Sequence, residues 1–292
     1  MVMSITKIDC ALMSRLRLTL LTLFAMTAFA GNSLLCRMAL KHSGIDPASF
    51  TTIRIVSGAI TLWLIVRVRG GTSGLLGNWP SALALFVYAA AFSFAYVSLS
   101  AGTGALLLFG AVQATMIGYS SWAGNRLAAP QKLGLLVALG GLVGLMLPGL
   151  SAPALNGSLL MVAAGVSWGV YSLHGRGGGD PLRVTAGNFM RAVVPAAFVS
   201  VATLPAVSLD LSGVGFAVAS GALASGVGYA IWYTALPGLK VTSAATIQLS
   251  VPVIAAMAGI VFLNEELSLR LFIASCAILG GIALVVVQRR RS

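Results

Sequence analysis

Six strongly polar side chains lie inside otherwise apolar stretches of this chain. A polar group in such a stretch normally faces a protein interior or a water-filled path, because lipid offers it no partner. We predict that three amides among the six, Asn32, Gln113 and Gln248, contact a bound small molecule. The alternative is that these amides form hydrogen bonds between helices, worth roughly 0.6–2 kcal/mol each. The remaining three are Arg54, Asn188 and Arg191.

Aromatic residues recur at helical spacing in the same stretches. Aromatic walls with a few amide groups are typical of sites for flat or apolar side chains. The alternative is that these rings form interface belts or ordinary packing. The stripes are Tyr88, Phe92 and Tyr96; Trp168 and Tyr171; and Tyr229, Trp232 and Tyr233. From these we predict that Tyr96, Trp168, Tyr171 and Tyr229 contact the substrate.

Two arginines lie at mirror-image depths in their segments. Arg54 is about seven residues from one end of its stretch, roughly 10 Å at 1.5 Å per residue, and Arg191 is similarly deep from the other face. This symmetry favours a structural or gating role for both, with substrate contact as the alternative. Pro252 is predicted to interrupt its helix, because proline removes a backbone hydrogen bond.

The residue types needed for catalysis or metal binding are scattered. Cys10, Cys36 and Cys276 are far apart, and His42 and His174 fall at opposite faces of the expected membrane. The sequence has no phosphate loop, nucleophile elbow or pair of carboxylates within an apolar stretch. We therefore expect no enzyme activity, no metal and no cofactor.

The only charges deep within the apolar stretches are positive. A carrier that extrudes cations against protons usually needs a buried carboxylate, which can hold either the cation or the proton. We therefore expect neutral, zwitterionic or anionic cargo, without proton coupling through a carboxylate relay.

The composition is that of an all-α polytopic membrane protein. Of its 292 residues 58% are apolar and 8% charged, and its mean hydropathy is +0.98. A spanning helix needs about 20 mainly apolar residues. Ten windows qualify: 17–40, 47–67, 79–99, 103–124, 132–149, 153–173, 184–204, 213–235, 242–263 and 269–288.

The net charge of +12 reports membrane topology. In a soluble protein it would suggest nucleic acid as a partner, but here the basic residues gather in alternate loops. The positive-inside rule then places both termini in the cytoplasm. We predict a bacterial-type inner-membrane protein whose partners are lipid and a small molecule, with no nucleic acid, present as a monomer or weak dimer.

Two halves of the chain, 1–150 and 151–292, resemble each other. Leu-Gly-Gly at 139–141 recurs at 279–281, and Ile53-Arg54 recurs as Met190-Arg191. Five spans per half is an odd number, so the second half enters from the opposite side. Such inverted repeats are built around a central substrate site. An alternative reading of the first window as a signal peptide ending at Ala28-Phe29-Ala30 is disfavoured, because the apolar run continues beyond it.

The stretch from Tyr229 to Val286 resembles the C-terminal repeat of the drug/metabolite transporter superfamily, EamA family. The resemblance includes the aromatic cluster at 229–233, Gln248 with Pro252, and the closing Gly-Gly. It also includes the Asn264-Glu265-Glu266 turn, which the first half replaces with Gly124-Asn125-Arg126. The resemblance implies a basket of ten helices around a central cavity, and small metabolites carried by alternating access. Within the family the chain is most similar to YddG-type exporters, which handle aromatic amino acids.

Together these observations predict an exporter or facilitator of aromatic or neutral amino acids and related small metabolites. One alternative is a carrier of another small metabolite or drug-like compound in the same superfamily. The other, from a different class, is a non-transporting membrane scaffold or enzyme subunit.

Overall fold

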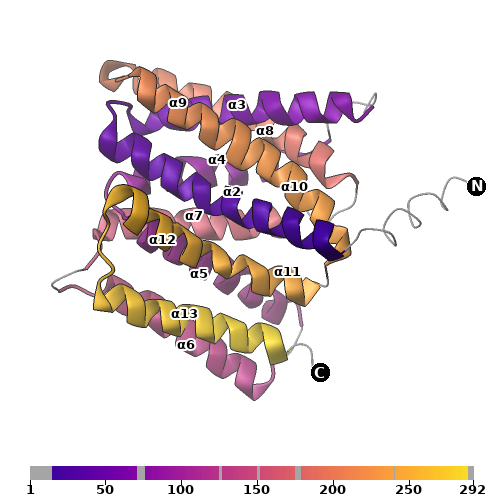
Figure 1. Cartoon of the computed structure of the whole chain (residues 1–292), viewed down its shortest axis with the longest axis vertical. Helices are drawn as coiled ribbons and strands as arrows, with labels where there is room; N and C mark the ends of the chain where they lie inside the picture. Colours follow the sequence, from indigo (N-terminus) through magenta and orange to yellow (C-terminus); the bar gives the residue numbers. More distant parts are fainter. Residues whose placement is uncertain are drawn as a thin grey trace, which may run out of the picture.

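The computed structural model describes residues 15–70, 76–124, 127–149, 152–174, 179–239 and 241–288. The two chain ends, for which the charge pattern predicts a cytoplasmic location, lie outside these ranges, as do Cys10 and Asn125. Within them the chain is helical, with short connections and no strand (Figure 1).

The helices of the first half run from α2 to α6. They are α2 (Arg15–His42), α3 (Pro47–Val68), α4 (Trp79–Tyr96), α5 (Ala101–Trp122) and α6 (Ala129–Met146). Several helix starts follow directly from local sequence. Asn78 caps α4 by accepting from the Ser81 backbone amide, and Ser100 caps α5 through Thr103. Short polar side chains at this position satisfy amides that have no partner within the helix.

The second half is less regular. It comprises α7 (Leu155–His174), α8 (Pro181–Ala202), α9 (Leu211–Ala219), the π-helical turn η2 (Ser220–Val227), α10 (Gly228–Ala235), α11 (Val241–Gln248), α12 (Ser250–Leu263) and α13 (Leu269–Gln288), with 3₁₀ turns η1 (Leu204–Ala206) and η3 (Leu236–Gly238). The segment α9–η2–α10 forms one continuous rod, drawn in orange in Figure 1.

Nine segments of the described chain are long and apolar enough to cross a membrane. They correspond to nine of the ten predicted windows, which confirms a multi-pass, all-helical membrane protein. The tenth window matches α7, which has 20 residues. That helix is not among the nine segments, because its polar side chains reduce its mean hydropathy; these are Asn156, Ser158, Ser167, Ser172 and His174.

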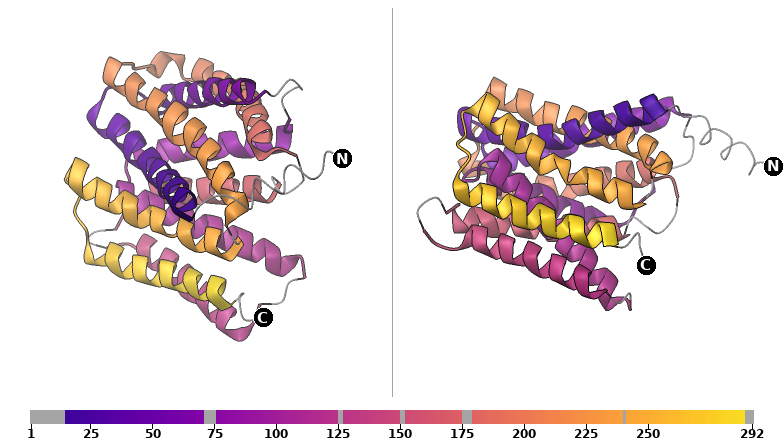
Figure 2. Two further views of the ribbon diagram at one scale, coloured as in Figure 1. Left: turned by 45° about the vertical axis from the view of Figure 1, so that its right-hand side comes forward. Right: turned by 60° about the horizontal axis from the view of Figure 1, so that its bottom comes forward.

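The repeated Leu-Gly-Gly stretches meet each other across α6 and α13, which pack side by side along one edge of the molecule (Figures 1 and 2). A Cβ atom on Gly281 would lie 2.4 Å from the carbonyl oxygen of Gly134, and one on Gly141 would lie 2.8 Å from Cβ of Ala277. Gly140 and Gly280, by contrast, have open space around them. The second glycine of each stretch therefore allows the two helices to approach closely, as small residues do in membrane helix packing.

Asp46 holds the start of α3 against the connection between α8 and α9. Its carboxylate accepts from the backbone amides of Ala48, Ser49 and Ser208 at 2.9–3.1 Å. Burial by itself raises the pKa of this carboxyl, but the hydrogen bonds from Ser49, Ser208 and Ala48 outweigh burial and hold the pKa below its usual value. The ionised form is thus favoured by folding.

We expect Asp46→Ala to lower the free energy of unfolding by about 1 kcal/mol at pH 7, as loss of an N-cap does. Because the folded-state pKa is depressed, the ionised carboxylate contributes fully above the unfolded value of 3.8. Its contribution is lost as pH falls through the folded-state pKa. The difference between the two proteins should therefore shrink below pH 3.8, measured by thermal unfolding in detergent. Asp46→Asn, which keeps an acceptor, is the control and should lose less at pH 7. A pH-independent difference would contradict this assignment.

Candidate functional site

A cavity of about 360 Å³ lies between helices of both halves. It is bounded by α2, α4 and α5 from the first half and by α7, α8, η2, α10 and α11 from the second. This volume is within the range of small-molecule sites. Among the described residues, no charged side chain lines it. The wall is mostly aromatic, formed by Phe29, Tyr88, Phe92, Phe109, Trp168, Tyr171, Tyr229, Trp232 and Tyr233.

Six of the seven predicted contact residues line this cavity. Trp168, Tyr171 and Tyr229 contribute rings, and the amides come from Asn32, Gln113 and Gln248. They belong to five different helices, which folding brings together.

Tyr96 is the seventh, and the structure places it outside the cavity wall. Its side chain is fully buried, its ring packs edge-on against Phe92 at 4.8 Å, and its hydroxyl donates to the carbonyl of Ala101. The reason lies in helix geometry. Positions i, i+4 and i+8 drift by about 40° per step and rise about 6 Å each time. Tyr88 and Phe92 therefore face the cavity, while Tyr96 has turned into the contact between α4 and α5.

Trp168 is at the centre of the aromatic wall. Its ring stacks on Tyr229 with centroids 5.5 Å apart and an interplanar angle of 17°. It also lies 4.7 Å from Tyr88 and 5.1 Å from Tyr171. Rings from α4, α7 and α10 thus form one cluster, and Phe29 of α2 extends it through Tyr229 and Trp232. A flat apolar group entering the cavity would contact this cluster.

The cavity amides fall into two kinds. Asn32 is held by its neighbours: Ser220 Oγ donates to Asn32 Oδ1 at 2.6 Å, and Asn32 Nδ2 donates to Tyr88 Oη at 3.4 Å. It therefore links three helices as well as lining the cavity. The amides of Gln113 and Gln248 have no hydrogen-bond partner among the described residues, which leaves both donors and acceptors available to a ligand.

A second polar cluster closes the wall near α8. Thr185 Oγ1 donates to the carbonyl of Pro181 at 2.8 Å, and the hydroxyl oxygens of Tyr233 and Tyr171 lie within hydrogen-bonding distance of it, at 3.2 and 3.4 Å. Asn188 Nδ2 donates to Tyr171 Oη at 3.5 Å. The sequence offers no signal for Thr185, because a hydroxyl one turn into a helix is common.

The two arginines do not occupy equivalent environments. Arg191 donates to the carbonyls of Leu76 and Gly187 at 3.0 Å, so it ties the segment before α4 to α8. Arg54 is only 2% exposed and donates to Tyr88 Oη at 3.0 Å. Its guanidinium also lies 4.7 Å from the ring centroid of Phe92. Arg54 is thus directly behind the cavity wall, whereas Arg191 is not.

Irregular helix geometry occurs beside the cavity in two places. The π-helical turn η2 carries Ser220 and Ser225, and π-turns within helices are frequent at functional sites. The second place is Leu249, where the helix is interrupted between α11 and α12. The interruption lies one turn before Pro252, whose missing amide leaves the Gln248 carbonyl without its helical donor.

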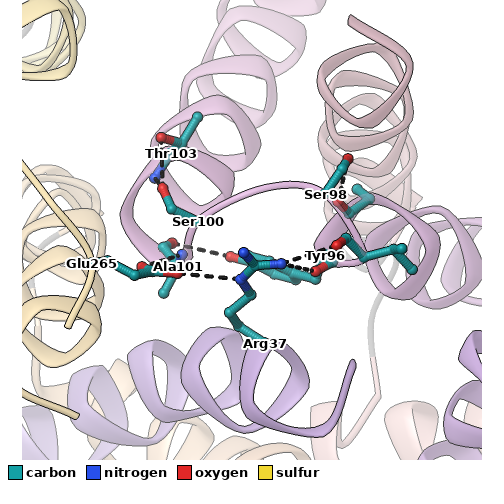
Figure 3. A network of polar contacts seen from close by, with 9 residues as sticks. Arg37, Tyr96, Ser98, Ser100, Ala101, Thr103 and Glu265 are labelled. Carbon is teal, nitrogen blue, oxygen red and sulfur yellow. Dashed lines mark hydrogen bonds and ion pairs between the residues drawn. The ribbon is translucent and has the colours of Figure 1, made fainter. Parts of the chain in front are cut away.

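Arg37 and Glu265 link α2, the end of α4, the start of α5 and the connection after α12 at one end of the cavity-forming helices (Figure 3). Arg37 Nε donates to Glu265 Oε1 at 3.2 Å, and Arg37 Nη1 donates to the carbonyls of Tyr96 and Val97. Glu265 Oε2 accepts from the backbone amide of Ala101 at 2.8 Å. We call this ion pair with its backbone contacts the Arg37–Glu265 clasp. Sequence reasoning singled out the turn that carries Glu265 but not Arg37, its partner.

The turn that carries Glu265 depends on Asn264. This residue has a φ of 51°, the left-handed conformation that ends α12. Asparagine tolerates this conformation better than most residues. The Glu265 amide then donates back to the carbonyl of Gly259 at 3.1 Å. The left-handed residue therefore turns the chain so that the Glu265 carboxylate reaches α2 and α5.

Comparison with known proteins finds similarity to transporters. The model of the EamA-like transporter family matches residues 155–287. A protein of Pseudomonas aeruginosa is 56% identical over 94% of this chain and 96% of its own length. A transporter of Archaeoglobus fulgidus is 25% identical over 86% of this chain and 93% of its own. The threonine/homoserine exporter RhtA of Salmonella typhimurium is 30% identical over 44% of each chain.

A solved crystal structure has a similar fold. It superposes with a TM-score of 0.66 at 22% identity, covering 96% of this chain and all of the other. At this identity the likeness concerns the fold alone.

Proposed function

We propose that this chain, which is similar to the EamA-like transporter family over residues 155–287, exports or facilitates the passage of aromatic and neutral amino acids and related small metabolites by alternating access. The observation that carries this proposal is the cavity itself. It combines a wall of stacked rings with the free amides of Gln113 and Gln248, and no charged side chain among its described lining residues. Such a cavity suits a flat or apolar side chain joined to a small polar group.

The distribution of charge supports the same cargo class. No acidic side chain lies on the described cavity wall, and the nearest deep charge is the guanidinium of Arg54. A cation would therefore meet no counter-charge there. The name of the relative RhtA, an exporter of threonine and homoserine, also favours amino acids as the class.

The proposed architecture is a repeat of five and five spans with opposite topology, divided near residue 150. Three of the described features support it. Both halves contribute helices to the cavity, α6 of one half packs against α13 of the other, and the second glycine of each repeated stretch, Gly141 and Gly281, lies in that contact. We place the protein in a bacterial-type inner membrane with both termini cytoplasmic, as a monomer or weak dimer, which agrees with the charge pattern.

Counterflow in liposomes tests the function. The full-length protein would be reconstituted with an excess of unlabelled amino acid inside, and uptake of the labelled amino acid would be followed. The panel would hold phenylalanine, tyrosine, tryptophan, leucine, threonine and homoserine. We expect uptake above empty liposomes for at least one aromatic member, without need for a pH gradient. No uptake of any member would overturn the proposal, and uptake that requires the gradient would reveal a proton relay.

The Arg37–Glu265 clasp supplies a test of alternating access. The pair is largely buried, with 11% and 9% of the side chains exposed. Glu265→Gln removes the charge while keeping the shape, and leaves a largely buried guanidinium without its counter-ion, which is unfavourable. We expect the helix ends that the clasp joins to separate more often. Cys36, one residue before Arg37 and fully buried, would then react about tenfold faster with a maleimide, for a change of about 1.4 kcal/mol.

The labelling would use a background in which Cys10 and Cys276 are serine, so that Cys36 is the only thiol. The adjacent Glu266 is exposed, and Glu266→Gln is the matched control. It should leave the rate unchanged. Equal labelling of Cys36 in the Glu265→Gln and control proteins would mean that the clasp does not govern access.

A further inference from the structure

Arg54 is a buried cation without an anionic partner in the described part of the chain. Its side chain is 2% exposed, and the ion pair found among the described residues joins Arg37 to Glu265 instead. The neighbours of the guanidinium are the Tyr88 hydroxyl and the rings of Tyr88 and Phe92. Its Nη1 has no hydrogen-bond partner there. Because an unpaired buried charge is unfavourable, this region would be stabilised by an incoming anion.

The Tyr88 hydroxyl connects this charge to the cavity. Its oxygen accepts from Arg54 Nη2 at 3.0 Å and from Asn32 Nδ2 at 3.4 Å. Neither group can accept a hydrogen bond in return, because a guanidinium and an amide nitrogen are donors only. Ser220 Oγ, which donates to Asn32 Oδ1, keeps the amide in this orientation.

A hydroxyl group has two acceptor lone pairs and one hydrogen to donate. Both lone pairs of Tyr88 are used by Arg54 and Asn32, so its hydrogen is left to donate elsewhere. Tyr88 and Asn32 both line the cavity. The cavity wall therefore presents an O–H donor with a fixed positive charge behind it.

We propose that the Tyr88 hydroxyl, supported by Arg54, binds the carboxylate of the cargo. This inference rests on the proposed transport function and narrows the cargo to carboxylate-bearing molecules with an apolar or aromatic remainder. A carboxylate accepts hydrogen bonds only, and its hydrogen bonds are stronger than those of neutral acceptors. The Trp168 ring lies 4.7 Å from that of Tyr88, so a carboxylate at Tyr88 places the rest of the molecule against the aromatic cluster.

The roles of the two residues differ. Tyr88 contacts the cargo, whereas Arg54 is not among the described lining residues and acts through Tyr88. Arg54 is therefore a positioning residue. If its role were purely structural, replacing it would not alter the ratio of the affinities for a carboxylate and its neutral analogue. That affinity ratio is the quantity to measure.

Binding of two matched probes tests the proposal without requiring transport. The full-length protein in lipid nanodiscs would be titrated with 3-phenylpropionate and with its amide, 3-phenylpropanamide, following tryptophan fluorescence. We expect the wild-type protein to bind the carboxylate at least about tenfold more tightly, as one charge-assisted hydrogen bond allows. Tyr88→Phe and Arg54→Met should each bring the ratio close to one. Tyr119→Phe changes an exposed tyrosine of α5 that is not among the described lining residues, and it should leave the ratio unchanged.

A wild-type ratio near one would overturn the proposal, as would a tenfold ratio that persists in both variants. If one variant does not unfold cooperatively, it is not correctly folded, and the affinity ratios of the wild type and of the other variant still test the proposal. The outcome is separable from that of the counterflow experiment. Amino-acid flux without carboxylate preference would refute only this subsite, whereas carboxylate preference without flux would refute the transport proposal and leave the subsite standing.

Discussion

Trp168→Ala is expected to weaken the binding of aromatic cargo by at least about tenfold. The substitution removes a ring that contacts Tyr88, Tyr171 and Tyr229 within 5.5 Å. Each aromatic pair is worth roughly 0.5–1.5 kcal/mol beyond its burial, and a ligand that stacks on this cluster loses its main partner. A loss of 1.4 kcal/mol corresponds to a factor of ten in affinity.

The measurement is the concentration dependence of counterflow for tryptophan or phenylalanine in liposomes. Trp122→Ala is the control, because it makes the same substitution outside the cavity wall. Trp168 is half-buried in that wall, whereas Trp122 is 84% exposed at the end of α5. The control should transport like the wild type. Unchanged half-saturation in Trp168→Ala would remove Trp168 from the substrate site, and equal losses in both proteins would point to a general effect on folding.

Gly221→Ala is expected to destabilise the protein by about 3 kcal/mol, at the upper end of the usual cost of overpacking. A Cβ atom there would lie 2.1 Å from the carbonyl oxygen of Arg54 and 2.1 Å from Ser57 Oγ. The backbone of α3 would have to move away from η2. This would displace both Arg54 and Ser220, which hold Tyr88 and Asn32 at the cavity wall. We therefore expect loss of cargo binding together with the loss of stability.

Thermal unfolding in detergent measures the first effect, and binding to nanodisc-embedded protein the second. Gly215 provides the control, because it lies on the same helical rod and has open space around it. Gly215→Ala should be neutral or slightly stabilising, since alanine favours the helix by up to about 1 kcal/mol over glycine. A Gly221→Ala protein as stable as Gly215→Ala would show that α3 and η2 are not held at this separation.

The elements of the fold were largely predictable, because the membrane requires each helix to satisfy its own backbone hydrogen bonds. The expected segment 47–67 is α3 at Pro47–Val68, and 269–288 is α13. The differences arise where the apolar pattern does not report helix geometry. Segment 242–263 is two helices broken at Leu249, and 213–235 contains the π-turn η2.

The types of residue that line the candidate site were predictable from the sequence, but the neighbours of each residue were not. Apolar surroundings mark Asn32, Gln113 and Gln248 as polar residues in need of a partner, and all three line the cavity. The pattern did not separate Tyr88 from Tyr96, since both belong to one stripe of α4. Their difference depends on where α4 crosses its neighbours.

The sequence by itself determined the class of protein, nine of the spanning segments in the described chain and the likeness to EamA-like transporters, because hydropathy and motifs are properties of short stretches of chain. Tertiary structure alone decided that Tyr88 faces the cavity, that Arg54 supports it from behind, and that Arg37 pairs with Glu265, 228 residues away. These contacts depend on the rotation and crossing of whole helices. Packing among small residues such as Gly58 and Gly221 sets those crossings, and helical periodicity does not encode them.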